Sequence, residues 1–407
     1  MPPQVAIVAD DLTGALDAGL QLALRGVETR VSLGLEPQPE AQALVLNADT
    51  RGVTERIALS RMTLAARLCA GRVVFKKVDS TLRGHVGPEA VALRNALGLR
   101  AALVAPAFVG AGRTVEGGRL LVEGVPVHQT SLARDPAWPA QTDDACALVG
   151  RGVAEAVALI SLDLVRRGPG ALASLAAQRG LYVAESVTPD DLAALARFAV
   201  AHVDQVLPCG SAGLAAAWAE ALALRGNAAP PWPGAPGPVL VVCGSRNAAT
   251  QAQLAALRAA RQPAWCELDV EAAPAAAREL GRQAAAALGQ GQHVVLSATG
   301  SRMLPGAALR IARSLGQAAL AALRPPAAHP APCAGLVLTG GDTALQVCAG
   351  LQITALTILA QVEPGVPGSR AASGAHAGLP IVTKAGGFGS PQALIHALEW
   401  INSGASR

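Results

Sequence analysis

The stretch VAIVADDLTG, residues 5–14, joins an apolar run to a helix-like segment through two adjacent aspartates, Asp10 and Asp11. This order is typical of a strand, a turn and a helix in an open α/β sheet, where ligands bind at the carboxyl ends of strands. Carboxylates are rarely buried without a partner, so packing alone explains the pair poorly. We expect at least one of them to bind hydroxyl groups, act as a general base or ligate a metal. The structural alternative is a cap of the following helix.

Apolar runs alternate with helix-like segments along most of the 407 residues. The alternation predicts right-handed βαβ units, and runs that are apolar throughout predict parallel strands covered on both faces. The expected strands are residues 5–9, 43–47, 73–77, 101–105, 156–161 and 205–209, followed by 239–243, 266–270, 293–298, 335–339, 355–359 and 380–383.

A chain of this length is long for a single core, and a stretch rich in proline and glycine interrupts it at residues 226–238. We therefore expect an α/β protein of two α/β domains, with mostly parallel sheets and a ligand cleft between the domains. The expected boundaries are residues 1–227, a linker at 228–237, and residues 238–407.

Charge and cysteine usage exclude several classes of protein. The formal net charge is only +4 and no basic run occurs, so nucleic acid is not an expected partner. The seven cysteines form no C-x-x-C pair, which disfavours a disulfide framework or a structural zinc site. Without a recognisable signal peptide, the sequence predicts a cytoplasmic protein. The uncharged stretch 343–362 contains three glutamines, and we interpret it as a helix, a turn and a buried strand rather than a membrane span.

Two clusters of polar residues follow expected strands. Arg51 lies in the turn after residues 43–47, where an arginine can bind a carboxylate or phosphate through two hydrogen bonds; an ordinary surface ion pair is the alternative. The stretch KKVDSTLRG, residues 76–84, combines three cations, an acid and two hydroxyls. Its cations Lys77 and Arg83 suit an anionic ligand. The hydrogen-bonding groups suited to hydroxyls are Asp79, Ser80 and Thr81, although Asp79 or Ser80 could instead cap a helix.

Three glycine-bearing turns follow strands of the second half. They begin at Gly244-Ser245, at Gly340-Gly341-Asp342-Thr343 and at Gly386-Gly387-Phe388-Gly389. Backbone N–H groups at such strand-to-helix turns favour phosphate. No P-loop motif occurs, and no G-x-G-x-x-G opens the first βα unit, which disfavours a nicotinamide-dependent dehydrogenase. The three turns together predict a nucleotide. Lys384 lies just before the last turn and could neutralise phosphate charge, with an ordinary surface lysine as the alternative.

In their order and joint occurrence these motifs resemble the four-carbon acid sugar kinases, which phosphorylate threonate, erythronate or 3-oxo-tetronate with ATP. The resemblance spans nearly the whole chain. It rests on residues 9–15 with Asp17, 76–84, 106–108 with Gly112-Arg113, 210–214, Gly244-Ser245 with Thr250 and Gln251, 340–343, and Lys384 with 387–389.

The resemblance implies a sugar-acid-binding N-terminal domain and a nucleotide-binding C-terminal domain. The implied acceptor-side residues are Asp10, Asp11, Arg51, Lys77, Asp79, Ser80, Thr81 and Arg83, with Asp11 or Asp79 as the general base. The implied nucleotide-side residues are Ser245, Gly340, Gly341, Asp342, Thr343, Gly386, Gly387 and Gly389. Mg²⁺ would be bound through the nucleotide phosphates, without a separate metal site on the protein.

The segments 17–21 and 130–136 look more like the threonate and erythronate kinases. The 3-oxo-tetronate kinases tend to carry Lys-Ser-Arg after the second strand, where this chain has Asp49-Thr50-Arg51. Phosphorylation of threonate or erythronate at the terminal hydroxyl is the expected activity. A 3-oxo-tetronate kinase and a non-catalytic sugar-acid sensor are the alternatives. The expected partners are the acid sugar and ATP, with no membrane and a possible homodimer.

Overall fold

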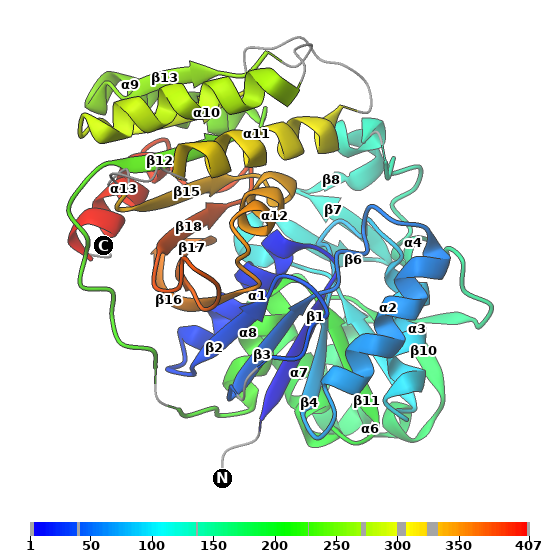
Figure 1. The fold of residues 1–407 in the computed structure, drawn as a ribbon. Coiled ribbons are helices and arrows are strands. Elements are labelled where there is room, and N and C mark those ends of the chain that lie inside the picture. Colours follow the sequence, from blue (N-terminus) through cyan, green and yellow to red (C-terminus); the bar gives the residue numbers. More distant parts are fainter. Residues whose placement is uncertain are drawn as a thin grey trace. The chain divides into compact units, whose positions relative to one another are not determined.

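The computed structural model describes residues 4–38, 41–135, 137–226, 228–269, 274–298, 307–323 and 333–404. The chain separates into two compact units, Met1–Asn227 and Ala228–Arg407. In Figure 1 the first unit runs from blue through cyan to green, and the second ends in red. Each unit contains a mostly parallel β-sheet with helices between its strands, which confirms the expected fold class.

In the main sheet of the first unit all neighbouring strands are parallel, in the order β2-β3-β1-β4-β11-β5-β10-β9. In register, Ala9 of β1 lies opposite Asn47 of β3 and Lys77 of β4. The turns that follow these three strands therefore leave the same edge of the sheet. The strands are β1 Val5–Ala9, β2 Thr29–Ser32, β3 Ala43–Asn47, β4 Val73–Lys77, β5 Ala101–Ala105, β9 Val157–Ile160, β10 Gly180–Ala184 and β11 Val206–Gly210.

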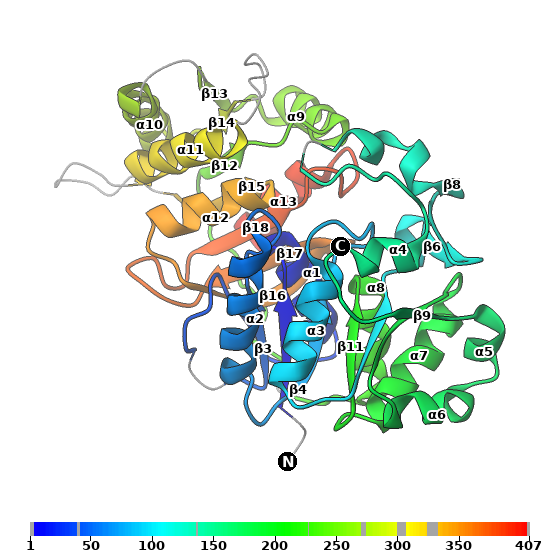
Figure 2. The same cartoon turned by 90° about the vertical axis from the view of Figure 1, so that its right-hand side faces the viewer.

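Helices cover both faces of this sheet, which is why most of its strands are largely apolar. On one face Val74 shares a core with Met62 of α2, and α2 packs beside α3 (Figure 2). On the other face the ring of Phe75 lies 5.3 Å from that of Trp218 in α8. The helices are α1 Leu12–Ala23, α2 Glu55–Leu68, α3 Val86–Ala96, α4 Ala145–Gly150, α5 Leu162–Arg166, α6 Pro169–Ala177, α7 Pro189–Ala201 and α8 Ala212–Ala221.

The first unit also has a small antiparallel sheet that the sequence patterns did not predict. It consists of β6 Arg113–Glu116, β7 Arg119–Val122 and β8 Val125–Pro126. Gly117 and Gly118 connect β6 to β7 with φ values of 57° and 73°. Two consecutive residues with positive φ suit a tight hairpin, because that turn matches the twist of the paired strands.

The second unit has the strand order β13-β14-β12-β15-β18-β17-β16. The neighbours from β13 to β18 are parallel, whereas β17 runs antiparallel to both β18 and β16. The strands are β12 Val239–Cys243, β13 Ala264–Glu267, β14 Val294–Ser297, β15 Gly335–Thr339, β16 Ala355–Glu363, β17 Val366–Ala371 and β18 Pro380–Lys384. The strand expected at 266–270 begins two residues earlier, at Ala264, and Val270 lies outside the described residues.

The helices of the second unit are α9 Ala248–Arg261, α10 Pro274–Gly289, α11 Ala308–Leu323, α12 Gly341–Gly350 and α13 Ala393–Ser403. The uncharged stretch 343–362 lies in α12, a turn and β16, as the sequence predicted. In the described part of the chain, no helix is both long enough and apolar enough to cross a membrane.

Candidate functional site

The acidic pair follows β1 directly. Asp10 is 3% exposed, and its Oδ1 atom is buried without a hydrogen-bond donor among the described residues. Asp11 is the N-cap of α1, because its Oδ1 accepts a hydrogen bond from the backbone N–H of Gly14 at 2.8 Å. Asp11 therefore caps the following helix, which was the structural alternative given for the acidic pair. Only one of its oxygens is used for the cap.

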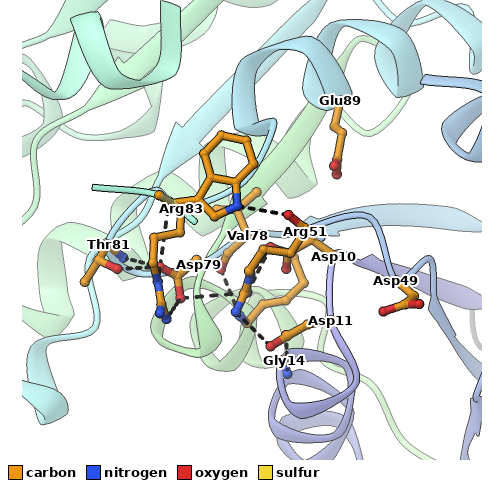
Figure 3. Close-up of polar contacts among 12 residues, drawn as sticks. Asp10, Asp11, Gly14, Asp49, Arg51, Val78, Asp79, Thr81, Arg83 and Glu89 are labelled. Carbon is orange, nitrogen blue, oxygen red and sulfur yellow. Dashed lines mark hydrogen bonds and ion pairs between the residues drawn. The ribbon is translucent and has the colours of Figure 1, made fainter. Parts of the chain in front are cut away.

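Arg51 joins the two carboxylates. Its Nε donates to Oδ2 of Asp10 at 2.9 Å and its Nη1 donates to Oδ2 of Asp11 at 2.8 Å (Figure 3). Backbone contacts hold the turn that carries it, because the N–H groups of Thr50 and Arg51 donate to the carbonyl oxygen of Asp10 at 2.9 and 3.2 Å. Asp49 opens this turn with a φ of 48°, a conformation that aspartate tolerates better than most residues.

The charge on Arg51 is shared among three acids. Its Nη2 lies 2.9 Å from Oδ2 of Asp10 and 3.8 Å from Oδ1 of Asp79. Burial by itself lowers the pKa of Arg51, but the carboxylates of Asp10, Asp11 and Asp79 together raise it well above its ordinary value. Arg51 therefore stays cationic and links the acids after β1 to the acid after β4.

Asp79 organises the turn after β4. Its Oδ2 accepts from Nε of Arg83 at 2.9 Å and its Oδ1 accepts from Nη2 at 3.0 Å. The backbone N–H of Thr81 donates to the same Oδ2 at 3.2 Å, and the Thr81 hydroxyl donates to it as well. Burial alone raises the pKa of Asp79, but Arg51 and Arg83 lower it far below its usual range. Asp79 is therefore an ionised acceptor with both oxygens in use.

Ser80 and Thr81 lie in this turn rather than in a helix. The next helix, α3, begins only at Val86, so neither Asp79 nor Ser80 caps it. Leu82 has a left-handed φ of 59°, which bends the chain and returns Arg83 to Asp79. The helix-cap alternative for this cluster is therefore wrong, because the carboxylate caps a turn.

Lys77, the last residue of β4, is 5% exposed and lies over the first turn of α1. Its Nζ donates to the carbonyl oxygen of Val78 at 2.8 Å. A Cβ atom on Gly14 would lie 3.0 Å from this Nζ and 2.6 Å from Oδ1 of Asp11, so the glycine leaves the space that both groups occupy. Lys76 differs, because it forms a fully buried ion pair with Glu89 at 2.8 Å.

Asp17 is a further acid beside this cluster. It lies on α1, two turns from Asp11, and is partly buried. Burial raises its pKa to about 6; Lys77 opposes this shift and Asp11 adds to it. The one charged residue in the helix 12–23 is the signal in the sequence that marks this position.

The segment after the short helix Ser131–Arg134 also reaches the cluster. Oδ2 of Asp135 accepts from Nη1 of Arg83 at 3.3 Å. The indole Nε1 of Trp138 donates to the backbone carbonyl of Arg51 at 2.9 Å. The sequence patterns did not predict the role of Trp138. The one feature of the sequence that singles out Trp138 is the scarcity of aromatic residues, which make up 2% of the chain.

In the second unit, two of the expected glycine turns line one cavity of about 260 Å³. Thr343 lies in the first turn of α12, and a Cβ atom on Gly244 would collide with its hydroxyl. Gly340 precedes this helix with a φ of 91°, which favours glycine. The cavity is lined by Gly244, Ser245, Arg246, Ala308, Ile311, Ala312, Gly340, Gly341, Asp342 and Thr343.

Thr250 connects the third glycine turn, at Gly386–Gly389, to the first, at Gly244-Ser245. The Thr250 hydroxyl lies 2.7 Å from the carbonyl oxygen of Gly386 and 3.2 Å from the Ser245 hydroxyl. A Cβ atom on Gly386 would collide with the Ser245 hydroxyl, so only a glycine permits this approach. The buried Gln253 holds the rest of the turn, because its Nε2 lies 2.9–3.1 Å from the carbonyl oxygens of Phe388, Gly389 and Ser390.

Lys384 lies beneath these turns at the end of β18. It is 3% exposed, and its Nζ lies 3.2 Å from the Thr250 hydroxyl and 3.0 Å from the carbonyl oxygen of Ala385. Burial lowers its pKa to about 8, while Cys243 and Glu363 oppose that shift. An anion nearby would stabilise the charged form of this buried amine.

A dedicated metal centre is not evident in the described residues, where no group of three or more His, Cys, Asp or Glu side chains could hold an ion. The residues that line the cavity include Asp342 and Thr343, whose side chains carry oxygen atoms. Oxygen ligands of this kind suit Mg²⁺ that arrives on nucleotide phosphates.

The two units match two family profiles. A profile described as a sugar-binding N-terminal domain matches residues 5–218, and one described as a nucleotide-binding C-terminal domain matches residues 240–394. The D-threonate kinase of Bordetella bronchiseptica is 36% identical over 98% of this chain and 98% of its own length. The chain belongs to the four-carbon acid sugar kinase family. A D-erythronate kinase of Heliobacterium modesticaldum is 30% identical over 98% of this chain and 97% of its own length.

Solved structures agree with the fold of this acid sugar kinase. A Salmonella typhimurium protein described as a putative tRNA synthase has a TM-score of 0.80 at 22% identity, covering 97% of this chain and 98% of its own. The Haemophilus influenzae protein HI1011, of the family DUF1537, has a TM-score of 0.74 at 22% identity and covers 98% of this chain and 100% of its own. At this identity the likeness concerns the fold alone.

Within this kinase, the structure brings together the expected residues of each unit. Side-chain contacts link Asp10, Asp11, Arg51, Asp79, Thr81 and Arg83. The turns at Ser245 and Gly340–Thr343 share one cavity, and Gly386 meets Ser245 through Thr250. Gly387 and Gly389 belong to the turn that Gln253 holds. Trp138 and Gln253 contact these residues in the structure but were not among the site residues expected from the sequence.

Proposed function

We propose that this kinase transfers the terminal phosphoryl group of ATP to the terminal hydroxyl of a four-carbon acid sugar, with threonate or erythronate as the acceptor. The observation that carries the proposal is the acid–cation cluster at the ends of β1, β3 and β4 in a chain whose other unit has glycine turns around a cavity. The D-threonate kinases of Bordetella and Salmonella, at 36% and 33% identity, favour threonate over 3-oxo-tetronate, whose Methylobacterium kinase is 32% identical.

Lys77 is the best-placed cation for the carboxylate of the acid sugar. Arg51 and Arg83 already pair with aspartates, which offsets their charges. Among the described residues, no carboxylate lies within ion-pair distance of the Lys77 ammonium, which donates only to a backbone carbonyl. A buried cation without a carboxylate in contact favours an anionic ligand. Arg51 and Arg83 then complete the site that binds this carboxylate, and they hold the aspartates in place.

The hydroxyl groups of the acceptor suit the aspartates and hydroxyls of the cluster. The buried Oδ1 of Asp10 lacks a donor, and a sugar hydroxyl would supply one. Asp79, Ser80 and Thr81 line the neighbouring turn and are proposed to bind further hydroxyls.

Asp11 is the stronger of the two candidates for the general base. A base must accept a proton near neutral pH, and Arg51 and Arg83 hold the pKa of Asp79 far below its usual range against the effect of burial. Both oxygens of Asp79 accept charged hydrogen bonds from Arg83, whereas Asp11 accepts one charged hydrogen bond from Arg51 and a neutral one from the backbone N–H of Gly14. Asp11 is more open, with about a quarter of its side chain exposed. It can therefore receive the proton of the attacking hydroxyl, while Asp79 orients Arg83.

The nucleotide phosphates are proposed to lie on the glycine turns, at Ser245, Gly340–Thr343 and Gly386–Gly389. The N-terminus of α12 supplies the positive end of a helix dipole, and Lys384 adds a positive charge. Mg²⁺ bound with the phosphates would supply further charge neutralisation, and Asp342 and Thr343 are the residues that would hold it. Phosphoryl transfer depends mainly on such positioning and neutralisation. A ligand cleft between the two units stays a prediction.

The decisive experiment is an assay of ADP release with D-threonate, L-threonate, D-erythronate and 3-oxo-tetronate. We expect turnover with threonate or erythronate that depends on MgATP, and phosphorylation of the terminal hydroxyl detected by ³¹P NMR. Turnover only with 3-oxo-tetronate would replace the proposed substrate. An absence of turnover with all four, together with calorimetric binding of an acid but not of MgATP, would instead favour a sugar-acid sensor.

A further inference from the structure

Asp135 and Trp138 contact both arginines of the acid–cation cluster from a distant part of the chain. Trp138 donates its indole N–H to the carbonyl oxygen of Arg51, 87 residues away, at 2.9 Å. Asp135 accepts from Arg83, 52 residues away, at 3.3 Å. The two residues come from one short segment that follows the helix Ser131–Arg134. One segment therefore reaches the turn after β3 and the turn after β4.

The contact of Trp138 completes the attachment of the Arg51 turn. The N–H groups of Thr50 and Arg51 are bound by the carbonyl oxygen of Asp10. The carbonyl oxygen of Val53 lies 2.8 Å from Nε2 of His85. The rings of His85 and Trp138 meet edge to face, with their centroids 4.8 Å apart. Trp138 binds the carbonyl oxygen of Arg51, so the backbone of this turn is held on both sides of the Arg51 Cα atom.

Asp135 shapes the segment and contacts the cluster with one carboxylate. Its Oδ1 accepts from the N–H groups of Ala137 and Trp138 at 3.0 and 2.8 Å, so this oxygen holds the backbone that carries the indole. Its Oδ2 accepts from Arg83. Burial raises the pKa of Asp135, but the two backbone N–H groups and Arg83 together lower it, so the side chain is ionised.

We propose that Asp135 and Trp138 are positioning residues of the acid-sugar site. They act through Arg51 and Arg83 and so set the orientation of Asp10, Asp11 and Asp79. The inference rests on the proposed function of that cluster. A segment with this role affects the apparent affinity for the acid sugar and leaves the nucleotide unit unchanged.

The first test is the variant Trp138→Phe, which removes the indole N–H and keeps a ring beside His85. We expect KM for D-threonate to rise about tenfold, the effect of one lost hydrogen bond, with KM for ATP unchanged. Trp232→Phe is the matched control, because Trp232 donates to the carbonyl oxygen of Ile401 at the same 2.9 Å in the second unit. An equal change of KM in both variants, or no change in Trp138→Phe, would overturn the proposal.

The second test is Asp135→Asn, which can still accept the backbone N–H groups but has no charge for Arg83. We expect KM for the acid to rise about three- to tenfold, and Asp135→Glu to recover part of the loss because it restores the charge. A loss of thermal stability without a change of KM would mark Asp135 as merely structural and refute its part of the proposal.

A third measurement does not require the proposed activity. In protein labelled with ¹⁵N-arginine, the Nε–H signal of Arg51, assigned with Arg51→Lys, reports how firmly its guanidinium is held. We expect faster hydrogen exchange of this signal in Trp138→Phe and no change in Trp232→Phe. Unchanged exchange in Trp138→Phe would refute the positioning role. If the wild type turned over none of the four acids, the proposed function would fail while this measurement still decided the role of Trp138.

Discussion

At the scale of single residues, Asp11 combines a structural and a chemical role. One oxygen caps α1 through Gly14, and the other accepts from Arg51. Asparagine is as good an N-cap as aspartate but a far weaker base. The two roles can therefore be separated by a single substitution at this position.

We expect Asp11→Asn to lower kcat at least about 100-fold, the range typical of a lost general base, with little change in MgATP binding. The melting temperature should stay close to that of the wild type, because the cap is kept. Rapid-quench turnover and calorimetric titration with MgATP measure the two effects. Turnover equal to that of the wild type would remove Asp11 as the base.

Asp17 links the site to the pH dependence of stability. Burial raises its pKa from 3.8 in the unfolded chain to about 6, so the folded protein binds the extra proton between these values. The favourable contribution of Asp17 to the free energy of unfolding is fully present below about pH 4. It is lost as the pH rises through about 6. We expect Asp17→Asn to stabilise the protein at pH 8 by about 1–3 kcal/mol. This gain in the free energy of unfolding should disappear toward pH 4 in denaturant titrations; a gain that is independent of pH would contradict the assignment.

At the scale of elements, the turns between strands and helices carry the chemistry. After β1, β3 and β4 the turns bring acids and cations together, because parallel strands in register end at one edge. The turns after β12, β15 and β18 approach closely: a Cβ atom on Gly244 would collide with Thr343, and one on Gly386 would collide with Ser245. Their spacing is therefore sensitive to a single methyl group.

Gly386→Ala tests this spacing. The added Cβ would collide with the Ser245 hydroxyl and displace one turn from the other. We expect MgATP affinity to fall about tenfold or more, with binding of the acid sugar unchanged, in calorimetric titrations. Gly170→Ala, on α6 where no atom lies within 4 Å of the new Cβ, is the control. Equal MgATP affinity in Gly386→Ala and the wild type would exclude this turn from the nucleotide site.

At the scale of the whole molecule, the expected linker at residues 228–237 belongs in part to the second unit. Trp232 donates to the carbonyl oxygen of Ile401, and its ring lies 6.2 Å from that of Trp400. The amide of Asn402 binds the carbonyl oxygens of Ala235 and Gly237, each at 2.9 Å. The expected boundary at residue 238 would remove these contacts. The possible homodimer stays a prediction that sedimentation can test.

The boundary can be tested with two fragments. We expect residues 228–407 to melt at a higher temperature than residues 238–407, because only the longer fragment keeps Trp232 packed on Trp400. Calorimetry of both fragments, with Trp232→Ala in the longer one as the control, measures the difference. Equal melting temperatures would indicate that the stretch adds nothing to the unit.

The sequence by itself determined the βα units, the fold class and the clusters at strand ends, because apolar runs, helical periodicity and turn residues are local signals. Strands with weaker local signals were missed: β2, β10, β17 and the β6–β8 sheet. In β17, Pro367 and Gly368 interrupt the pattern, and the strand is specified by its neighbours.

Only the tertiary structure decided which groups meet. It paired Arg51 with aspartates 40 and 41 residues away, joined Gln253 to a turn beyond residue 386, and bound Trp138 to the Arg51 turn. It also separated Lys76, buried against Glu89, from Lys77, which lies at the site. The physical reason is that partner choice depends on sheet order and register, which bring distant segments together, whereas spacing along the chain reports only near neighbours.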